Sequence, residues 1–246
     1  MSLNVKLIKN ESTGFQQPLL EPGMYPAYLV QVIGLGLQEQ RAFQGKEKPP
    51  KQKVRFVYEL IDAFMVDEDG NETEDPRMRG EELPLNSLEI ENANSTKRYL
   101  AIDPQMEADG DWAALVGKPI MVNLTKTRGK GANADKFYNN IAGTATPRSG
   151  DVKRWPEPKC DLVVFDFYEP DVEVLMSQPD WIQKRVKESL DFAGSSLEQA
   201  IADYVPKAPE GDDSPEAEED KKPAKKKEAK AKDVADTEDE EGDEDW

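Results

Sequence analysis

Residues 52–62, QKVRFVYELID, constrain the fold more than any other stretch, because apolar and polar side chains alternate along them. Alternation with a period of two places successive side chains on opposite faces of a β-strand. The apolar face would carry Val54, Phe56, Tyr58 and Leu60. The other face would carry Lys51, Lys53, Arg55, Val57 and Glu59. The pattern therefore predicts a half-buried antiparallel strand that turns a basic face to solvent.

Four further strands and one helix are predicted around this strand. The first strand is rich in Tyr, Val, Leu and Ile, and Gly34 and Gly36 would let it bulge or coil sharply. The order of elements is strand–strand–strand–helix–strand–strand, which is the order of an OB-fold, a five-stranded Greek-key barrel. We therefore expect a mainly β protein whose barrel core occupies residues 1–150. The strands are predicted at residues 24–38, 77–85, 119–126 and 136–145, and the helix at residues 94–103.

A second region, residues 151–205, has a different pattern. Residues 161–167, DLVVFDF, predict another strand. Residues 179–192 predict a helix whose apolar stripe would carry Trp181, Val186 and Leu190, with Ile182 beside them. The letters SSLE at the start of residues 195–204 are a capping box and predict a second helix there. Two short amphipathic helices need a surface to cover, so we expect this region to pack on the barrel.

The charge of the chain and its lack of histidine limit what it can do. The net charge is −18, with −9 in residues 206–246 and −9 in the 205 residues before them. The chain has no histidine, and Cys160 is its one cysteine, which argues against His-based catalysis, a Cys/His zinc site and an internal disulfide. We therefore expect no enzyme activity, no cofactor and no bound metal. No signal peptide or membrane-spanning stretch is apparent, so we expect a soluble protein of the cytoplasm.

Two basic segments stand out against the acidic whole. Residues 41–55 carry six cations and one acid, and residues 126–136 carry four cations and one acid. In an OB-fold these are the loops after the first and fourth strands, which flank the groove where oligonucleotides lie. By contrast, residues 59–75 hold eight acids and no cation, so the acidity belongs elsewhere on the surface. Ordinary solvated loops are the alternative interpretation of both segments.

Binding of a single strand also needs aromatic rings on which bases stack. Phe43 lies within the first basic segment, and Phe137 and Tyr138 follow the second, where alternation would send one of the two inward. Asn123 and Thr125 share the polar face of the fourth strand and are placed to contact phosphate or base edges. The candidate DNA-binding residues are Arg41, Phe43, Lys46, Lys48, Lys51, Lys53, Arg55, Asn123, Thr125, Lys126, Arg128, Lys130, Lys136 and Tyr138.

The segment at residues 233–246 is acidic at nine of its fourteen positions and ends in Trp246. Like charges repel and few apolar groups are present, so we expect residues 206–246 to form a disordered charged tail. A tethered polyanion can occupy a cationic groove as nucleic acid would, and the terminal ring offers a contact for a partner protein. A solubilising tail is the plainer alternative. The candidate partner-binding residues are Asp243, Glu244, Asp245 and Trp246.

Two other functions remain open at this point. The overall charge of −18 fits an inhibitor that mimics DNA, although such a protein should have no basic groove. A cluster of carboxylates suggests a metal-dependent nuclease, although its spacing matches no known metal site. The carboxylates of this cluster are Asp161, Asp166, Glu169, Asp171 and Glu173.

The chain resembles the single-stranded DNA-binding proteins of tailed phages. The similar segments cover most of residues 20–204, and they lack the metal ligands of the zinc-containing phage proteins. The resemblance implies an OB-fold that coats single strands in replication and recombination without sequence preference. It also implies a tail that recruits a polymerase, a helicase or recombination factors in the cytoplasm of the host. The segments are LEPGMYPAYLVQVIGLGLQ (20–38), DAFMVDEDG (62–70), NSTKRYLAID (94–103), LVGKP (115–119), NIAGT (140–144) and PDWIQKRVKESLDFAGSSLEQA (179–200).

Overall fold

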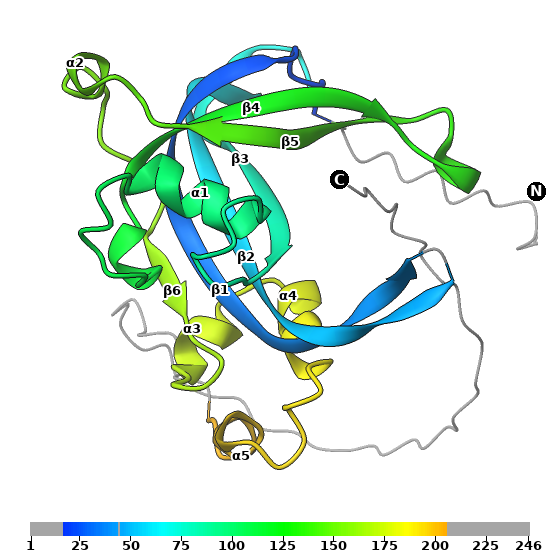
Figure 1. Cartoon of the computed structure of the whole chain (residues 1–246). Coiled ribbons are helices and arrows are strands. Elements are labelled where there is room, and N and C mark those ends of the chain that lie inside the picture. Colours follow the sequence, from blue (N-terminus) through cyan, green and yellow to red (C-terminus); the bar gives the residue numbers. More distant parts are fainter. Residues whose placement is uncertain (1–16, 44, 206–246) are drawn as a thin grey trace, which may run out of the picture. The chain divides into compact units, whose positions relative to one another are not determined.

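The computed structural model of the chain describes residues 17–43 and 45–205, and it is mainly β (Figure 1). Five strands form a curled antiparallel sheet, a half-barrel, with a sixth short strand and a few short helices around it. None of the helices in these residues is long and apolar enough to cross a membrane. The strands are β1 (Gly23–Phe43), β2 (Lys46–Val66), β3 (Glu72–Pro84), β4 (Pro119–Arg128), β5 (Phe137–Ala145) and β6 (Val163–Phe165). The helices are α1 (Asn94–Ile102), α2 (Ser149–Val152), α3 (Val172–Met176), α4 (Asp180–Lys187) and α5 (Ser196–Ala202), with single turns η2 (Ala113–Leu115) and η3 (Gly131–Asn133).

Strand β1 is the centre of the sheet, whose order is β3-β2-β1-β4-β5. One edge of β1 pairs with β2 from Ala27 to Phe43. The other edge pairs first with β4, between Gly23 and Tyr28, and then in parallel with the short strand β6. The predicted order of three strands, a helix and two strands is confirmed.

Two glycines of β1 lie just after its pairing with β6, where the chain that leaves β6 comes close. The register with β2 shifts between Gly34 and Gly36, and Gly36 has a φ of 71°, which disfavours other residues. A Cβ at Gly34 would lie 3.2 Å from the Phe165 carbonyl oxygen and the Phe167 nitrogen. The irregularity predicted at these glycines is therefore present, and it makes room for the chain around β6.

Strands β1 and β2 are longer than the sequence pattern predicts. The predicted strands at residues 24–38 and 52–62 leave residues 39–51 as a polar connection, but Gln40 lies opposite Lys48 and Phe43 opposite Lys46 in a continued hairpin. The register shifts where Pro49 and Pro50 occur. A bulge at this point accommodates two residues that lack a backbone N–H, so the prolines do not end the strand.

Apolar side chains on the inner face of the curled sheet form the core, as the alternation in β2 predicts. Val54, Phe56, Tyr58 and Leu60 are all buried there. Helix α1 and the turn before η2 close one side, since the Trp112 ring lies 4.3 Å from the Phe56 ring and 5.2 Å from the Tyr99 ring of α1 between centroids.

A buried ion pair fastens α1 to β3. Arg98 donates to Glu81 from Nε at 2.8 Å and from Nη2 at 3.0 Å, and the Tyr58 hydroxyl donates to the same carboxylate at 3.0 Å. Burial and the Glu81 charge hold the pKa of Tyr58 well above its ordinary value, so its hydroxyl stays a donor. The helix, β3 and β2 therefore share one polar connection inside the fold.

The outer face of β1 is covered by the C-terminal region, as expected. Ile33 and Leu35 pack in a second apolar cluster with residues of β6, α3, α4 and α5. The predicted helix at residues 179–192 is shorter and ends at Lys187, because the Leu190 N–H and the Ser189 hydroxyl both donate to the Leu37 carbonyl oxygen of β1. The predicted start at Ser195 is confirmed, since Ser195 Oγ accepts from the Glu198 N–H. The Glu198 carboxylate accepts the Gly194 N–H and not the Ser195 N–H, so the second bond of a capping box is shifted by one residue.

Strands β3 and β5, the two edges of the sheet, are joined by the segment before β1. The Gln17 side-chain amide bonds both the N–H and the carbonyl oxygen of Val66, and Arg77 of β3 donates to the Pro18 carbonyl oxygen at 2.7 Å. On the other edge, the Asn139 amide of β5 bonds both the N–H and the carbonyl oxygen of Leu20, each at 2.8 Å. We call residues 17–21 the strap.

Candidate nucleic-acid interface

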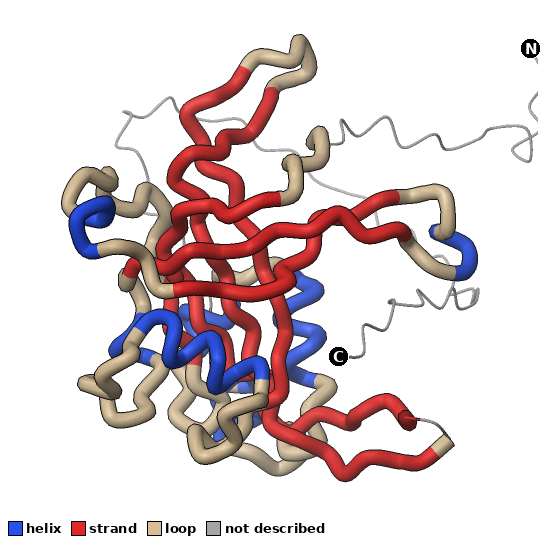
Figure 2. Tube along the Cα trace, turned by 45° about the horizontal axis from the view of Figure 1, so that its top comes forward, coloured by secondary structure: helices blue, strands red, loops and turns tan. Residues whose placement is uncertain are grey.

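Two hairpins extend beyond the body of the sheet, and the basic segments form them. We call residues 38–52 of β1 and β2 the first arm, and residues 126–138 of β4 and β5 the second arm. Both views show the two arms leaving the same side of the body (Figures 1 and 2). The sheet therefore presents its two most basic segments on the same side, although they are far apart in the sequence.

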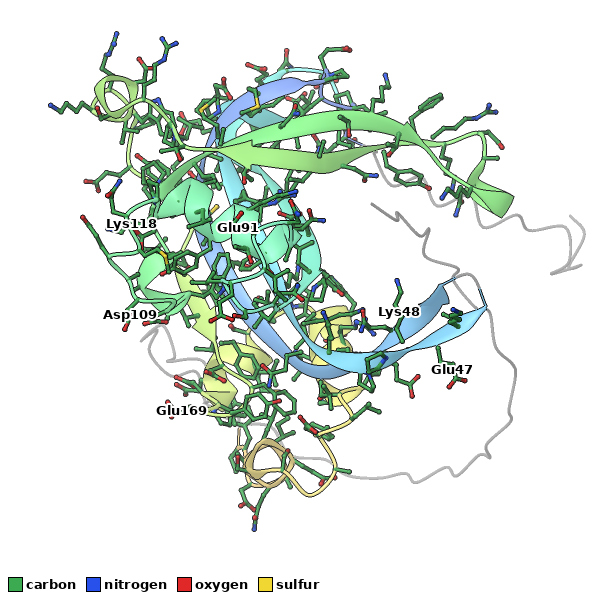
Figure 3. The ribbon with its side chains drawn as sticks, viewed as in Figure 1. Glu47, Lys48, Glu91, Asp109, Lys118 and Glu169 are labelled. Atoms are coloured by element: carbon green, nitrogen blue, oxygen red, sulfur yellow. The ribbon has the colours of Figure 1, made fainter. Side chains whose placement is uncertain are left out.

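The first arm is mostly exposed toward its tip. Lys46 and Lys48 are exposed, and Lys48 points to the side of the ribbon opposite Glu47 (Figure 3). Lys51 is half-buried and donates to the Asn86 side-chain oxygen at 2.6 Å. Two other candidates, Arg41 and Phe43, lie on β1 in this arm, but their side chains are outside the described part of the structure.

The second arm carries the other four predicted cations. Lys126, Arg128, Lys130 and Lys136 are exposed on it. The Arg128 guanidinium donates to the Ala134 carbonyl oxygen, which ties the arm to its own turn. The positive charge of this arm is therefore held in a rigid hairpin and faces solvent.

The aromatic residues of the second arm, Phe137 and Tyr138, are 48% and 42% exposed and lie on opposite faces. Phe137 lies opposite Arg128, and the Lys126 Nζ is 5.9 Å from the centroid of its ring. Tyr138 lies opposite Thr127 and over Gly129, where a Cβ would come within 3.0 Å of its ring. Neither ring points into the core, contrary to the expectation that one would. Both rings are open to a stacking partner.

Asn123 and Thr125 are half-buried on the face of β4 opposite Leu124. Thr125 Oγ1 is 3.4 Å from the Asn140 carbonyl oxygen of β5. They share the face of Tyr138, so the predicted polar face of this strand is present.

The basic face of β2 is more covered than the sequence pattern predicts. Lys53 and Arg55 are half-buried, and the Arg55 guanidinium carbon lies 4.4 Å from the centroid of the Trp181 ring in α4. Farther along, Val57 and Glu59 are buried, and Glu59 accepts the backbone N–H groups of residues 159 and 160. Alternation shows which face a side chain takes, but it does not show what other part of the chain covers that face.

Two carboxylates of the suggested nuclease site, Asp171 and Asp166, bond nearby backbone groups. Asp171 caps α3 by accepting the N–H groups of Glu173 and Val174. Asp166 accepts the Tyr168 N–H at 2.8 Å. Among residues 17–43 and 45–205, no three Asp, Glu, Cys or His side chains are grouped to hold a metal ion.

Trp181 is the residue whose position the sequence reasoning missed. The pattern places it in the apolar stripe of its helix, but Ile182 and Val186 are the buried residues and Trp181 is half-exposed. The sequence contains a signal for this position of Trp181. Ile182 and Val186 stand four residues apart, so they share one face of the helix and can form its buried stripe without the tryptophan.

Comparison of the chain with protein-family models, with curated proteins and with solved structures finds no match. The function is therefore argued from the residues of the chain and their geometry.

Cys160 is expected to be unreactive in the folded protein. Burial raises the pKa of its thiol to about 12, and the neighbouring carboxylate of Glu59 adds to the shift. Because the thiolate is the reactive form, we expect Ellman's reagent at pH 8 to modify the folded chain slowly and the urea-unfolded chain at once. Release of one equivalent of thionitrobenzoate within the mixing time in native buffer would contradict this expectation.

Proposed function

We propose that the protein binds single-stranded DNA between and along its two arms, without preference for sequence. The observation that carries the proposal is that two basic hairpins leave the same side of the sheet and that one of them bears two exposed aromatic rings. Lysines and arginines attract the phosphate backbone, and aromatic rings stack on bases of any identity.

The topology is compatible with an OB-fold and supports the proposal. In an OB barrel the first strand is shared between both halves of the sheet, and the loops after strands one and four flank the ligand. The order β3-β2-β1-β4-β5, with β1 central, has that arrangement when the barrel is opened between β3 and β5. The two arms then correspond to the two loops.

The resemblance to tailed-phage proteins supports the proposal that this binding serves DNA replication and recombination in the host cytoplasm. We propose that the protein coats single strands and has no catalytic activity, cofactor or metal of its own. Its acidic tail would recruit a polymerase, a helicase or a recombination factor through Asp243, Glu244, Asp245 and Trp246. These four residues lie outside the described part of the structure.

Titration of a fluorescent oligo-dT, at two salt concentrations and with and without Mg²⁺, tests the proposed function. We expect tight binding that weakens steeply with salt and leaves the oligonucleotide intact, because the phosphate contacts release counterions. An absence of binding at low salt would favour the DNA-mimicking inhibitor. Cleavage that depends on Mg²⁺ and is lost in Asp166→Ala would favour the nuclease.

Deletion of residues 233–246 is expected to tighten the binding of oligo-dT. The deleted residues carry nine acids, and they would compete with DNA for the arms most strongly at low salt, where screening is weakest. Trp246→Ala should leave the affinity for DNA unchanged but abolish the capture of a replication partner, since the charges and not the ring compete with DNA. Equal affinities of the full and shortened chains at every salt concentration would leave the tail only a solubilising role.

A further inference from the structure

Trp181 is held in an unusual position on the outer face of the sheet. Its ring is 50% exposed, and one side of it lies against the Arg55 guanidinium at 4.4 Å. A guanidinium at this distance from an indole is attracted to the face of the ring and keeps it in place. Because the core stripe of α4 is complete without it, packing of α4 does not explain a tryptophan at this position.

A glycine beneath Arg55 completes a layered arrangement. A Cβ at Gly80 of β3 would come within 2.5 Å of Arg55 Nη2 and within 2.9 Å of Cζ. The guanidinium therefore lies directly against the backbone of β3, and Trp181 lies on the guanidinium. The layers are the β3 backbone, the Arg55 guanidinium, the Trp181 ring and then solvent.

The charged side chains around the ring are mixed in sign, and the cations among them offer a contact for a phosphate. Lys184, one turn along α4, is exposed. Arg185 lies within 3.4 Å of both Glu82 of β3 and Glu188, and the Lys184 Nζ lies 4.0 Å from Glu188, so these two cations face these two acids. Asp180, at the start of α4, is the acid next to the ring in the sequence.

The face of β2 connects this position to the first arm. Lys53 and Lys51 follow Arg55 on the same face, at two-residue steps of about 7 Å each along the strand. The side of the sheet that carries Trp181 is therefore continuous with one of the two arms.

We propose that Trp181 is a stacking platform for a base of single-stranded nucleic acid, held flat by Arg55 and Gly80. The inference rests on the proposed function and extends it, because the bound strand then passes from the first arm across β2 to α4. The ligand that fits is a planar base joined to a phosphate, since the ring supplies the stacking surface and Lys184 supplies a cation.

Trp181→Ala in the full chain tests this platform, with fluorescent oligo-dT as the probe. We expect its affinity to fall roughly tenfold or more with the salt dependence unchanged, because stacking and not charge is lost. Trp181→Phe should lose less. Gly80→Ala leaves the ring in the chain but displaces the guanidinium beneath it, so it should also weaken binding.

Leu190→Ala is the matched control, because Leu190 is 49% exposed in the same C-terminal region and has no ring. Its affinity should equal that of the wild type. A second readout is the tryptophan fluorescence of the wild type, whose quenching by oligo-dT should be smaller in Trp181→Phe, whether or not the alanine variant folds.

Wild-type affinity and wild-type quenching in the Trp181 variants would overturn the platform. The proposed function would stand in that case if alanine variants of the arm lysines still lost affinity. Failure of the wild-type chain to bind oligo-dT at all would instead overturn the proposed function, and the platform with it.

Discussion

The double variant Lys48→Ala/Lys130→Ala, with one cation removed from each arm, is expected to bind oligo-dT about 50-fold more weakly at about 50 mM salt. Each lysine that contacts a phosphate displaces counterions, so its loss should lower the slope of log affinity against log salt by roughly 0.7. Titration of fluorescent oligo-dT at four salt concentrations gives both quantities. The loss should be the same for oligonucleotides of any sequence, because the contacts are to phosphates.

The matched control is Lys118→Ala/Lys153→Ala, which removes the same charge from the other side of the body. Lys118 lies there, away from both arms, and Lys153 ends α2 (Figure 3). We expect its affinity and salt slope to stay near those of the wild type. Equal losses in the two double variants would mean diffuse attraction to scattered charge and would contradict an interface on the arms. Lys184 is unsuitable as such a control, because the proposed platform places it beside the bound base.

Arg98→Ala is expected to lower the free energy of unfolding by about 3–5 kcal/mol. The substitution leaves the Glu81 carboxylate mostly buried without its guanidinium, while the Tyr58 hydroxyl still donates to it. A buried charge without its partner is costly, and the cost exceeds the net value of the pair itself. Urea denaturation followed by circular dichroism measures the change.

Two further variants test whether burial of the Glu81 charge causes the loss of stability in Arg98→Ala. Arg154→Ala breaks an exposed ion pair with Asp151 and should cost less than about 1 kcal/mol. The double variant Arg98→Met/Glu81→Leu removes both charges and should be more stable than Arg98→Ala. A loss of under 1 kcal/mol in Arg98→Ala would show that water or a neighbouring group compensates Glu81.

The sequence predicts the sheet well because its strongest signal is local. The alternation in β2 identifies the buried residues, and Gly34 and Gly36 identify the irregularity in β1. The length of the first arm was missed, because Pro49 and Pro50 normally end strands and only pairing with the opposite strand shows that a bulge accommodates them.

The candidate site is predicted in part for the same reason. Exposed charge on a hairpin, as at Lys48 and Lys126, follows from composition and needs no knowledge of distant residues. The environment of Arg55 does not follow from composition, because the residue that covers it, Trp181, is more than one hundred positions away in the chain. Long-range coverage of a face leaves no periodic signal in either segment.

The strap also acts as a brace between strands that lie far apart in the sheet order. Its five residues bond the end of β2 and the Arg77 side chain of β3 on one side, and the Asn139 side chain of β5 on the other. A segment that is bonded to both borders limits how far they can separate. The width of the opening between β3 and β5 is therefore set by residues that precede the whole sheet in the chain, and not by a backbone ladder between the two strands.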